Sequence, residues 1–149
     1  MLTHYKDASK QRLRMWIQLL RATRSAENHL REYLRVHHET TLPRFDVMAA
    51  LYRRPEGLMM TELSRMLLVS NGNSTTVVDR LIKDGLVRRK VPDHDRRSVQ
   101  VALTAKGVKT FEGWARDHER EIAFHFSDIK DEDAEAITAI LKRLGRKET

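Results

Sequence analysis

The sequence predicts a mainly α-helical protein with a small β-hairpin wing, arranged as a winged helix-turn-helix. Three observations predict this fold class. Apolar residues recur at helical spacing over most of the 149 residues. Two short helical segments, TELSRMLLV and NGNSTTVVDRLIKD, follow one another almost directly. The period then changes to alternation over residues 86–104, which is typical of two strands and a turn.

The first helix is predicted from Lys10 to Val36, because no Gly or Pro occurs before Pro43. Such a helix is longer than a small core needs. Its apolar seam at positions 13, 20 and 34 indicates packing against a partner helix. A long helix buried inside one chain is the alternative.

The remaining elements have recognisable ends. Thr41 is the expected N-cap of a second helix, Thr61 and Ser70 of the next two, and Thr104 of a long one that ends near Phe126. Gly85 is the expected helix C-terminal glycine, and a last helix runs from Asp131 to Gly145. The inward residues expected in the helices are Phe45, Met48, Leu51, Tyr52, Leu63, Met66, Leu67, Val77, Val78, Leu81 and Ile82. In the second strand, the expected inward residues Val99, Val101 and Leu103 alternate with Ser98, Gln100 and Ala102.

Composition narrows the function classes. The net charge of +7 and the pI of about 10.0 favour a polyanionic partner, most often nucleic acid. There is no cysteine, so thiol-based redox sensing is excluded, and neither a signal peptide nor a membrane span is expected. We therefore expect a cytoplasmic protein with no membrane partner and no cofactor. The motifs GxSxG, GxxxxGK[ST], HExxH and GxGxxG do not occur, so we do not expect an enzyme.

The second helix of the helix-turn-helix begins with small polar residues, as a helix that reads DNA bases requires. Asparagine pairs with adenine through two hydrogen bonds, and a helix N-terminus favours a phosphate oxygen. The candidate DNA contacts on this helix are Ser70, Asn71, Asn73, Thr75, Thr76, Arg80 and Lys83. An ordinary exposed helix start is the alternative.

The hairpin beside this helix is basic. Arg88, Arg89, Lys90, Arg96 and Arg97 lie on or near its strands and loop. An Arg at the tip of such a wing enters a narrow minor groove, and Asp95 is placed to orient it. A solvated turn with mixed charges is the alternative.

The segment from Thr61 to Gly107 resembles the MarR family of transcriptional regulators, through ELSRMLLVSNGNSTTVVDRLIKDGLV and DHDRRSVQVALTAKG. The resemblance implies one domain over 1–149, with a DNA-binding lobe at about 41–104 and dimerisation helices at about 6–40 and 105–149. It implies a homodimeric repressor on a pseudo-palindromic operator of double-stranded DNA. Arg97 would then enter the minor groove and Arg80 would face phosphate. Ser74 departs from the family pattern, in which many members have an apolar residue.

The resemblance also implies a small-molecule effector, bound between the dimerisation helices and the DNA-binding lobe. Aromatic and basic residues there suit an aromatic acid or an aromatic acyl-CoA thioester, and the sequence is similar to the subset of the family that senses such compounds. The candidate effector-binding residues are Trp16, Arg24, Tyr33, His37, His38, Phe45 and Phe111. The alternative is that Trp16 and Phe45 belong to the core.

Three other interpretations stay open. His118, Glu121 and His125 share one helix face, a spacing that can bind zinc, although no metal site is our expectation. A winged-helix module that binds protein, or an architectural protein that binds DNA without sequence preference, would have the same fold. The retained basic residues of the second helix and wing favour DNA over a protein partner.

Overall fold

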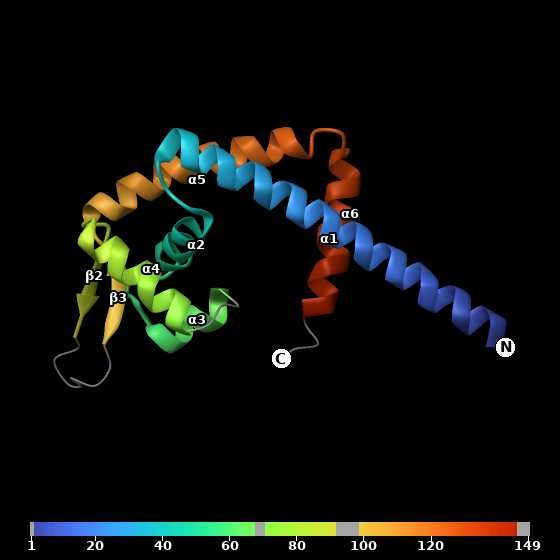
Figure 1. The fold of residues 1–149 in the computed structure, drawn as a ribbon, viewed down its shortest axis with the longest axis horizontal. Helices are drawn as coiled ribbons and strands as arrows, with labels where there is room; N and C mark the ends of the chain where they lie inside the picture. Colours follow the sequence, from blue (N-terminus) through green and yellow to red (C-terminus); the bar gives the residue numbers. More distant parts are fainter. Residues whose placement is uncertain (1, 68–70, 92–98, 146–149) are drawn as a thin grey trace.

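The computed structural model describes residues 2–67, 71–91 and 99–145, with side chains from Asp7 onward and, in the second segment, from Asn73. Its elements are α1 (Leu2–His38), α2 (Leu42–Tyr52), β1 (Leu58–Met59), α3 (Met60–Leu67), α4 (Asn71–Lys83), β2 (Val87–Lys90), β3 (Gln100–Leu103), α5 (Ala105–His125) and α6 (Asp131–Gly145). Figure 1 shows α2, α3, α4 and the strands gathered in one lobe, from which the N-terminal part of α1 extends as an arm.

The predicted fold class is confirmed, with one added strand. The described strands form an antiparallel sheet in the order β1-β3-β2, and β2–β3 is the predicted hairpin. The added strand β1 pairs Leu58 with Val101 and Met59 with Gln100. Two residues are too few to show an alternating pattern, so this strand has no signal in the sequence.

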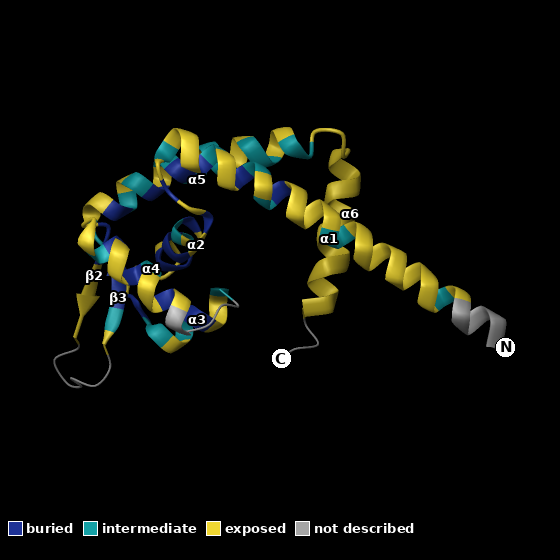
Figure 2. Ribbon diagram, in the orientation of Figure 1, coloured by how far each residue is buried: buried dark blue, intermediate teal, exposed yellow. Residues whose placement is uncertain are grey.

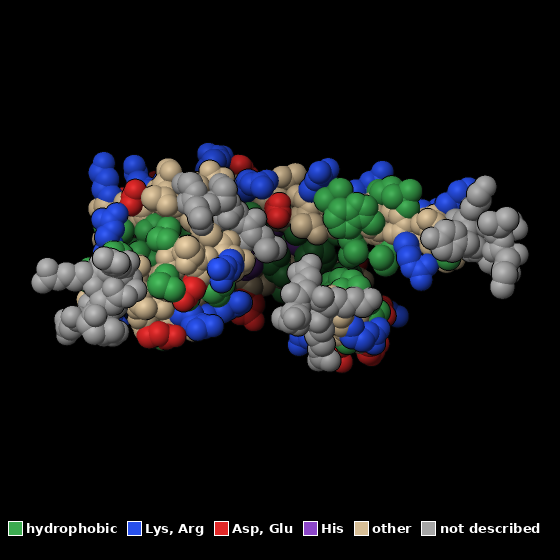
Figure 3. Space-filling model, turned by 90° about the horizontal axis from the view of Figure 1, so that it is seen from below, with side chains coloured by type: hydrophobic (Ala, Val, Ile, Leu, Met, Phe, Trp, Pro, Cys, Tyr) green, Lys and Arg blue, Asp and Glu red, His purple; other side chains and the backbone are tan. Residues whose placement is uncertain are grey.

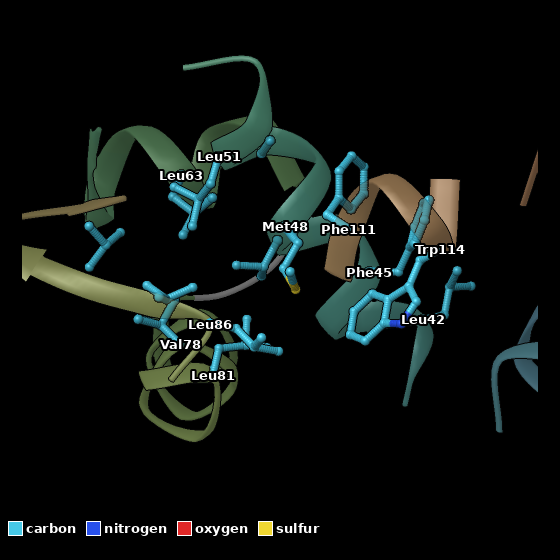
Figure 4. Close-up of a cluster of buried hydrophobic side chains, with 14 of the residues drawn as sticks. Leu42, Phe45, Met48, Leu51, Leu63, Val78, Leu81, Leu86, Phe111 and Trp114 are labelled. Atoms are coloured by element: carbon cyan, nitrogen blue, oxygen red, sulfur yellow. The ribbon is translucent and has the colours of Figure 1, made fainter. Parts of the chain in front are cut away.

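The core lies inside the lobe and continues under α5 and the C-terminal third of α1 (Figure 4). Leu34, Met48, Leu51, Leu63 and Leu81 are completely buried there. Burial of large apolar side chains contributes most of the favourable free energy of folding. Because Leu34 is part of this core, α1 joins the lobe to the arm as one continuous helix.

The predicted caps at Thr41, Thr104 and Gly85 are confirmed. The hydroxyl of Thr41 accepts a hydrogen bond from the Arg44 N–H at 3.3 Å, and that of Thr104 accepts one from the Gly107 N–H at 2.9 Å. Gly85 has a φ of 77°, in the left-handed region. The Leu86 N–H donates to the Leu81 carbonyl at 2.9 Å, the six-to-one bond of a Schellman motif.

Several predictions of burial and capping were wrong. Tyr52 and Met66 are 41% and 42% exposed, because Tyr52 is the last residue of α2 and Met66 lies in the last turn of α3. Thr61 lies inside α3, since β1 runs directly into this helix and the Glu62 carboxylate accepts the Met59 N–H at 3.4 Å instead.

The predicted alternation along the second strand also fails in part. Ala102 is 1% exposed while Val99 is 38% exposed. β3 is the central strand and contacts both α2 and α5, so a small residue there is covered, whereas Val99 precedes the paired segment. The predicted cap at Ser70 lies outside the described residues.

Large apolar side chains remain exposed on the arm of α1 and on α6. Figure 2 colours most of both segments as exposed. Trp16 is 55% exposed, so the interpretation of Trp16 as a core residue was wrong. No residue of α6 is buried over its length from Asp131 to Gly145. In the described parts of the chain, no helix is long and apolar enough to cross a membrane.

Candidate nucleic-acid interface

The first turns of α4 present polar side chains at the surface. Asn73, Thr75 and Thr76 are exposed, and all three are among the predicted DNA contacts. In Figure 1, α4 lies next to the β2–β3 hairpin at the same end of the molecule. A polar helix start beside a hairpin is the arrangement that enters a major groove with a wing alongside.

Ser74 fixes the rotation of α4. It is 1% exposed and lies on the same helical stripe as Val78 and Leu81, which are 2% and 0% exposed. Ser74 therefore occupies an inward position on α4. Because Ser74 points to the core side, its neighbours Asn73 and Thr75 point away from the core.

The candidate phosphate contacts on α4 are exposed at its C-terminal end. Arg80 Nε lies 3.5 Å from an Asp84 carboxylate oxygen, one helical turn away. Lys83 is also exposed. An exposed pair of this kind contributes little to stability, so the Arg80 guanidinium can exchange Asp84 for a phosphate at small cost.

The wing strand β2 carries three consecutive exposed cations, which begin at Arg88. Arg89 Nη2 lies 2.9 Å from Asp79 Oδ1 of α4, and the Lys90 ammonium donates to the Glu56 carbonyl at 3.4 Å. These contacts join the wing to α4 and to the turn after α2. Asp79 was not singled out in the sequence, because its partner is ten residues away and on a different element. Figure 3 shows Lys and Arg side chains spread over this lobe, with a few acidic ones among them.

Five of the predicted DNA contacts have no described side chain. Ser70, Asp95, Arg96 and Arg97 lie outside the described residues, as does the side chain of Asn71. Their roles stay predictions, including the orientation of Arg97 by Asp95.

A cavity of about 350 Å³ lies between α2, α3 and the first turns of α4, and the predicted DNA contacts Asn73 and Thr76 are among its lining residues. Asp46 lines it, and partial burial, together with repulsion from Glu27, raises the pKa of this carboxyl to about 6. Asp46 was not predicted from the sequence. Its only signal was an acidic residue between two inward apolar ones, Phe45 and Val47, in a helix that is otherwise largely apolar.

Five of the seven predicted effector-binding residues lie around the junction of α1, α2 and α5. The Tyr33 ring lies 4.3 Å from that of His37 and 6.1 Å from that of His38, and the Phe45 and Phe111 rings are 5.3 Å apart, measured between centroids. Phe45 and Phe111 are 6% exposed, so the alternative interpretation of Phe45 as core holds. The guanidinium of Arg120, a residue missed in the sequence, donates to the Tyr33 hydroxyl at 2.8 Å.

Trp16 and Arg24 do not join this group within one chain. Both are exposed on the arm of α1. Trp16 precedes Tyr33 by 17 positions on the same helix, which corresponds to about 25 Å along its axis. The structure therefore divides the predicted effector residues into a junction group and an arm group.

Histidine–carboxylate pairs connect α1 to α5. His29 Nε2 lies 2.8 Å from Glu121, and His38 Nε2 lies 2.7 Å from Asp117. His118 stacks on Phe45 with ring centroids 4.3 Å apart, and burial lowers its pKa. His118 and Glu121 are thus engaged with different partners. Over the described ranges, no three His, Asp or Glu side chains converge on a point that could hold a metal ion.

The fold and this interface define the class of winged-helix DNA-binding proteins, with a polar reading helix, a basic hairpin and long flanking helices. The chain belongs to the MarR family of helix-turn-helix transcriptional regulators. The model of the MarR family matches residues 38–98. The transcriptional regulator MhqR of Bacillus subtilis is 31% identical over 133 residues, which cover 89% of this chain and 90% of MhqR.

Other relatives agree with this assignment. PecS, a transcriptional regulator of Dickeya dadantii, is 32% identical over 67% of this chain and 61% of its own length. A MarR family regulator from Silicibacter pomeroyi has a crystal structure that matches with a TM-score of 0.81 and 32% identity, over 96% of this chain and 99% of that one. A mutant of Escherichia coli MarR in complex with operator DNA shares the fold, with a TM-score of 0.77 and 22% identity over 90% and 95% of the two chains. The relatives named here from Bacillus subtilis, Dickeya dadantii and Silicibacter pomeroyi are transcriptional regulators.

Proposed function

We propose that this chain represses transcription as a homodimer that binds a pseudo-palindromic operator and releases it when a small effector binds. The observation that carries the proposal is the exposed polar start of α4 beside the basic strand β2. In this arrangement Asn73 and Thr76 contact base edges, while Arg80, Lys83 and Arg88 contact phosphates. The wing residues Arg96 and Arg97 extend the contact into the minor groove.

The homodimer is supported by the apolar faces that one chain leaves exposed. Leu13, Trp16 and Ile17 on the arm are 56%, 55% and 38% exposed. Figure 3 shows hydrophobic side chains gathered on this arm beyond the lobe. The exposed apolar residues of α6 are Ile137, Ile140, Leu141 and Leu144, between 43% and 52% exposed. Exposed apolar faces of this extent mark an interaction surface.

Charge complements this apolar pairing. Residues 8–26 of α1 contain five cationic side chains and no acidic one: Lys10, Arg12, Arg14, Arg21 and Arg24. The first turns of α6 contain Asp131, Glu132, Asp133 and Glu135. In a symmetric dimer each chain supplies both surfaces, so the basic arm of one copy attracts the acidic start of α6 in the other.

The effector of the proposal is an aromatic acid or an aromatic acyl-CoA thioester, bound near the junction of α1 and α5. Tyr33, His37 and His38 supply aromatic and imidazole rings there, and Arg120 supplies a guanidinium. Rings stack on an aromatic ligand, and cations pair with its carboxylate or with CoA phosphates. Effector binding would change the angle between the DNA-binding lobes of the two copies in the dimer. The affinity for DNA would then fall, typically by about 1–3 kcal/mol.

The test is selection of bound sites from a random DNA pool by the purified protein at near-physiological salt. We expect an inverted repeat with half-site centres about 10 base pairs apart. DNA binding without enrichment would favour the architectural alternative. No binding would favour the protein-interaction module. Genes downstream of an enriched repeat would then nominate effectors to test.

A further inference from the structure

The cavity between α2 and α4 has the composition of a small-molecule site. Its volume of about 350 Å³ lies within the range of ligand pockets in proteins. Its wall is apolar with a few polar groups, and the described lining residues are Pro43, Asp46, Val47, Leu67, Asn73, Ser74, Thr76 and Val77. Small-molecule sites combine an apolar wall with a few polar groups that fix the orientation of the ligand.

The charge of the cavity selects its ligand. Asp46 is the one charged side chain among its described lining residues. Glu27 of α1 adds a second negative charge close enough to repel the Asp46 carboxylate. An anionic ligand is therefore repelled, and a cationic one gains a charge-assisted hydrogen bond.

We propose that this cavity binds a small apolar amine, whose ammonium group pairs with the Asp46 carboxylate and whose apolar body packs against Val47, Leu67 and Val77. The ligand class differs from the aromatic acid assigned above to the α1–α5 junction, so the cavity is a second site. The Asp46 carboxyl, whose pKa is about 6, is mostly ionised above pH 7 and available for such a pair.

The cavity adjoins the predicted DNA-binding surface, because two of its lining residues, Asn73 and Thr76, are predicted base contacts. A bound amine contacts the same helical turn that reaches the major groove. Occupancy of the cavity therefore changes operator affinity, a consequence that rests on the proposed DNA binding. Amine binding itself does not depend on DNA.

The test is isothermal titration calorimetry of the full chain, without DNA, with 2-phenylethylamine and with 3-phenylpropionate. These probes share a phenyl ring and a short linker but carry opposite charges. We expect the amine to bind at least about tenfold more tightly than the acid, because only the amine pairs with Asp46. Asp46→Asn should weaken amine binding by about tenfold or more. Asp128→Asn, at an exposed position in the turn between α5 and α6, is the control and should leave amine binding unchanged.

Backbone amide NMR of the wild-type protein provides a second readout that needs no variant. The amine should shift the signals of Val47, Asn73 and Val77 and leave that of Ala134 on α6 in place. Equal or tighter binding of the acid, unchanged amine affinity in Asp46→Asn, shifts elsewhere, or no binding of either probe would overturn the proposal. Because the titration contains no DNA, its failure leaves the operator proposal standing, and a failed site selection leaves the amine result standing.

Discussion

The lobe and the arm of this chain contain the same types of apolar residue, but these residues are buried in the lobe and exposed on the arm. Leu51, Leu63 and Leu81 of the lobe are fully buried, whereas Leu13 of the arm and Leu144 of α6 are 56% and 52% exposed. All five belong to amphipathic helices with an apolar face. The difference is that the lobe folds its apolar faces against one another, while the arm and α6 have no such cover within the described chain.

The two regions therefore have different roles, because one stabilises the protomer and the other is available for assembly. The lobe core accounts for the folding of one chain, together with Leu30 and Leu34 of α1. The free energy available from the arm and α6 is realised only when another surface covers them. Substitutions in the two regions should therefore change different measured quantities.

The largest effect is expected from Leu51→Ala in the lobe. Leu51 is completely buried, and removal of its side chain leaves a cavity that costs about 2–5 kcal/mol of unfolding free energy. Urea unfolding followed by circular dichroism measures this loss. The matched control is Leu13→Ala on the exposed arm, measured at a protein concentration at which the proposed dimer is dissociated, where it should leave the unfolding of the lobe nearly unchanged. Equal losses from both substitutions would contradict the division into two regions.

Ile140→Glu should dissociate the proposed dimer. Ile140 is 47% exposed in one chain, so a carboxylate there is tolerated by the protomer but is costly at an apolar interface. We expect the dimer dissociation constant to rise by about a hundredfold, as measured by sedimentation equilibrium. Lys142→Glu, on the same exposed helix, is the control and should have a much smaller effect. A dimer that withstands Ile140→Glu would remove α6 from the interface.

The helices and their ends were predictable from the sequence because the ends have local chemical causes. Thr41, Thr104 and Gly85 act through bonds within a few residues, and the structure has each of them as predicted. β1 was missed because its two residues are defined by a partner strand about forty positions away. Burial was less predictable: Leu34 and Leu13 occupy the same predicted seam, yet only Leu34 meets a core within the chain.

The candidate site was predictable only where one local segment carries it. The polar start of α4 and the basic residues of β2 could be identified from contiguous sequence. Asp79–Arg89, Arg120–Tyr33 and the Asp46 cavity join separate elements of the chain, so no local pattern reports them. The division of the effector candidates into a junction group and an arm group was not predictable for the same reason. Helical spacing shows which residues share a face of one helix, but it does not show how far they lie from other elements.

A smaller effect within the lobe should distinguish Asn73 from Arg80. Asn73→Ala should lower operator affinity by about 1–3 kcal/mol while random DNA binds almost as before, because Asn73 is assigned to a base edge. Arg80→Ala should weaken both kinds of DNA similarly and reduce the salt dependence by about one ion. Fluorescence anisotropy at several salt concentrations measures both quantities. If Asn73→Ala weakened both DNAs equally, Asn73 would be a backbone contact.

The smallest expected effects concern the change of folding stability with pH. Asp46 in the lobe and His118 on the flanking helix α5 should change stability with pH in opposite directions. The pKa of Asp46 is raised from 3.8 to about 6, so the native chain binds more protons in that window and its stability falls as pH rises through it. The pKa of His118 is lowered from 6.5 by burial, so the native chain binds fewer protons and stability falls as pH drops below 6.5.

Two variants separate these contributions. Asp46→Asn should be more stable than wild type above pH 6 and should lose this advantage below about pH 4. His118→Gln should lose the decline in stability below pH 6.5. Each difference should stay below about 1 kcal/mol, because both groups retain contact with solvent. Urea midpoints between about pH 4 and pH 8 measure them, and slopes of the reverse sign would contradict the assigned environments.

In the proposed dimer, a second copy of the chain covers the arm and α6. Light scattering during size-exclusion chromatography at micromolar concentration measures the molar mass of the purified protein and so tests this claim. We predict twice the chain mass of 17.4 kDa. A mass of 17.4 kDa that persists as the concentration is raised would contradict the claim, because both apolar faces would then remain exposed to water in solution.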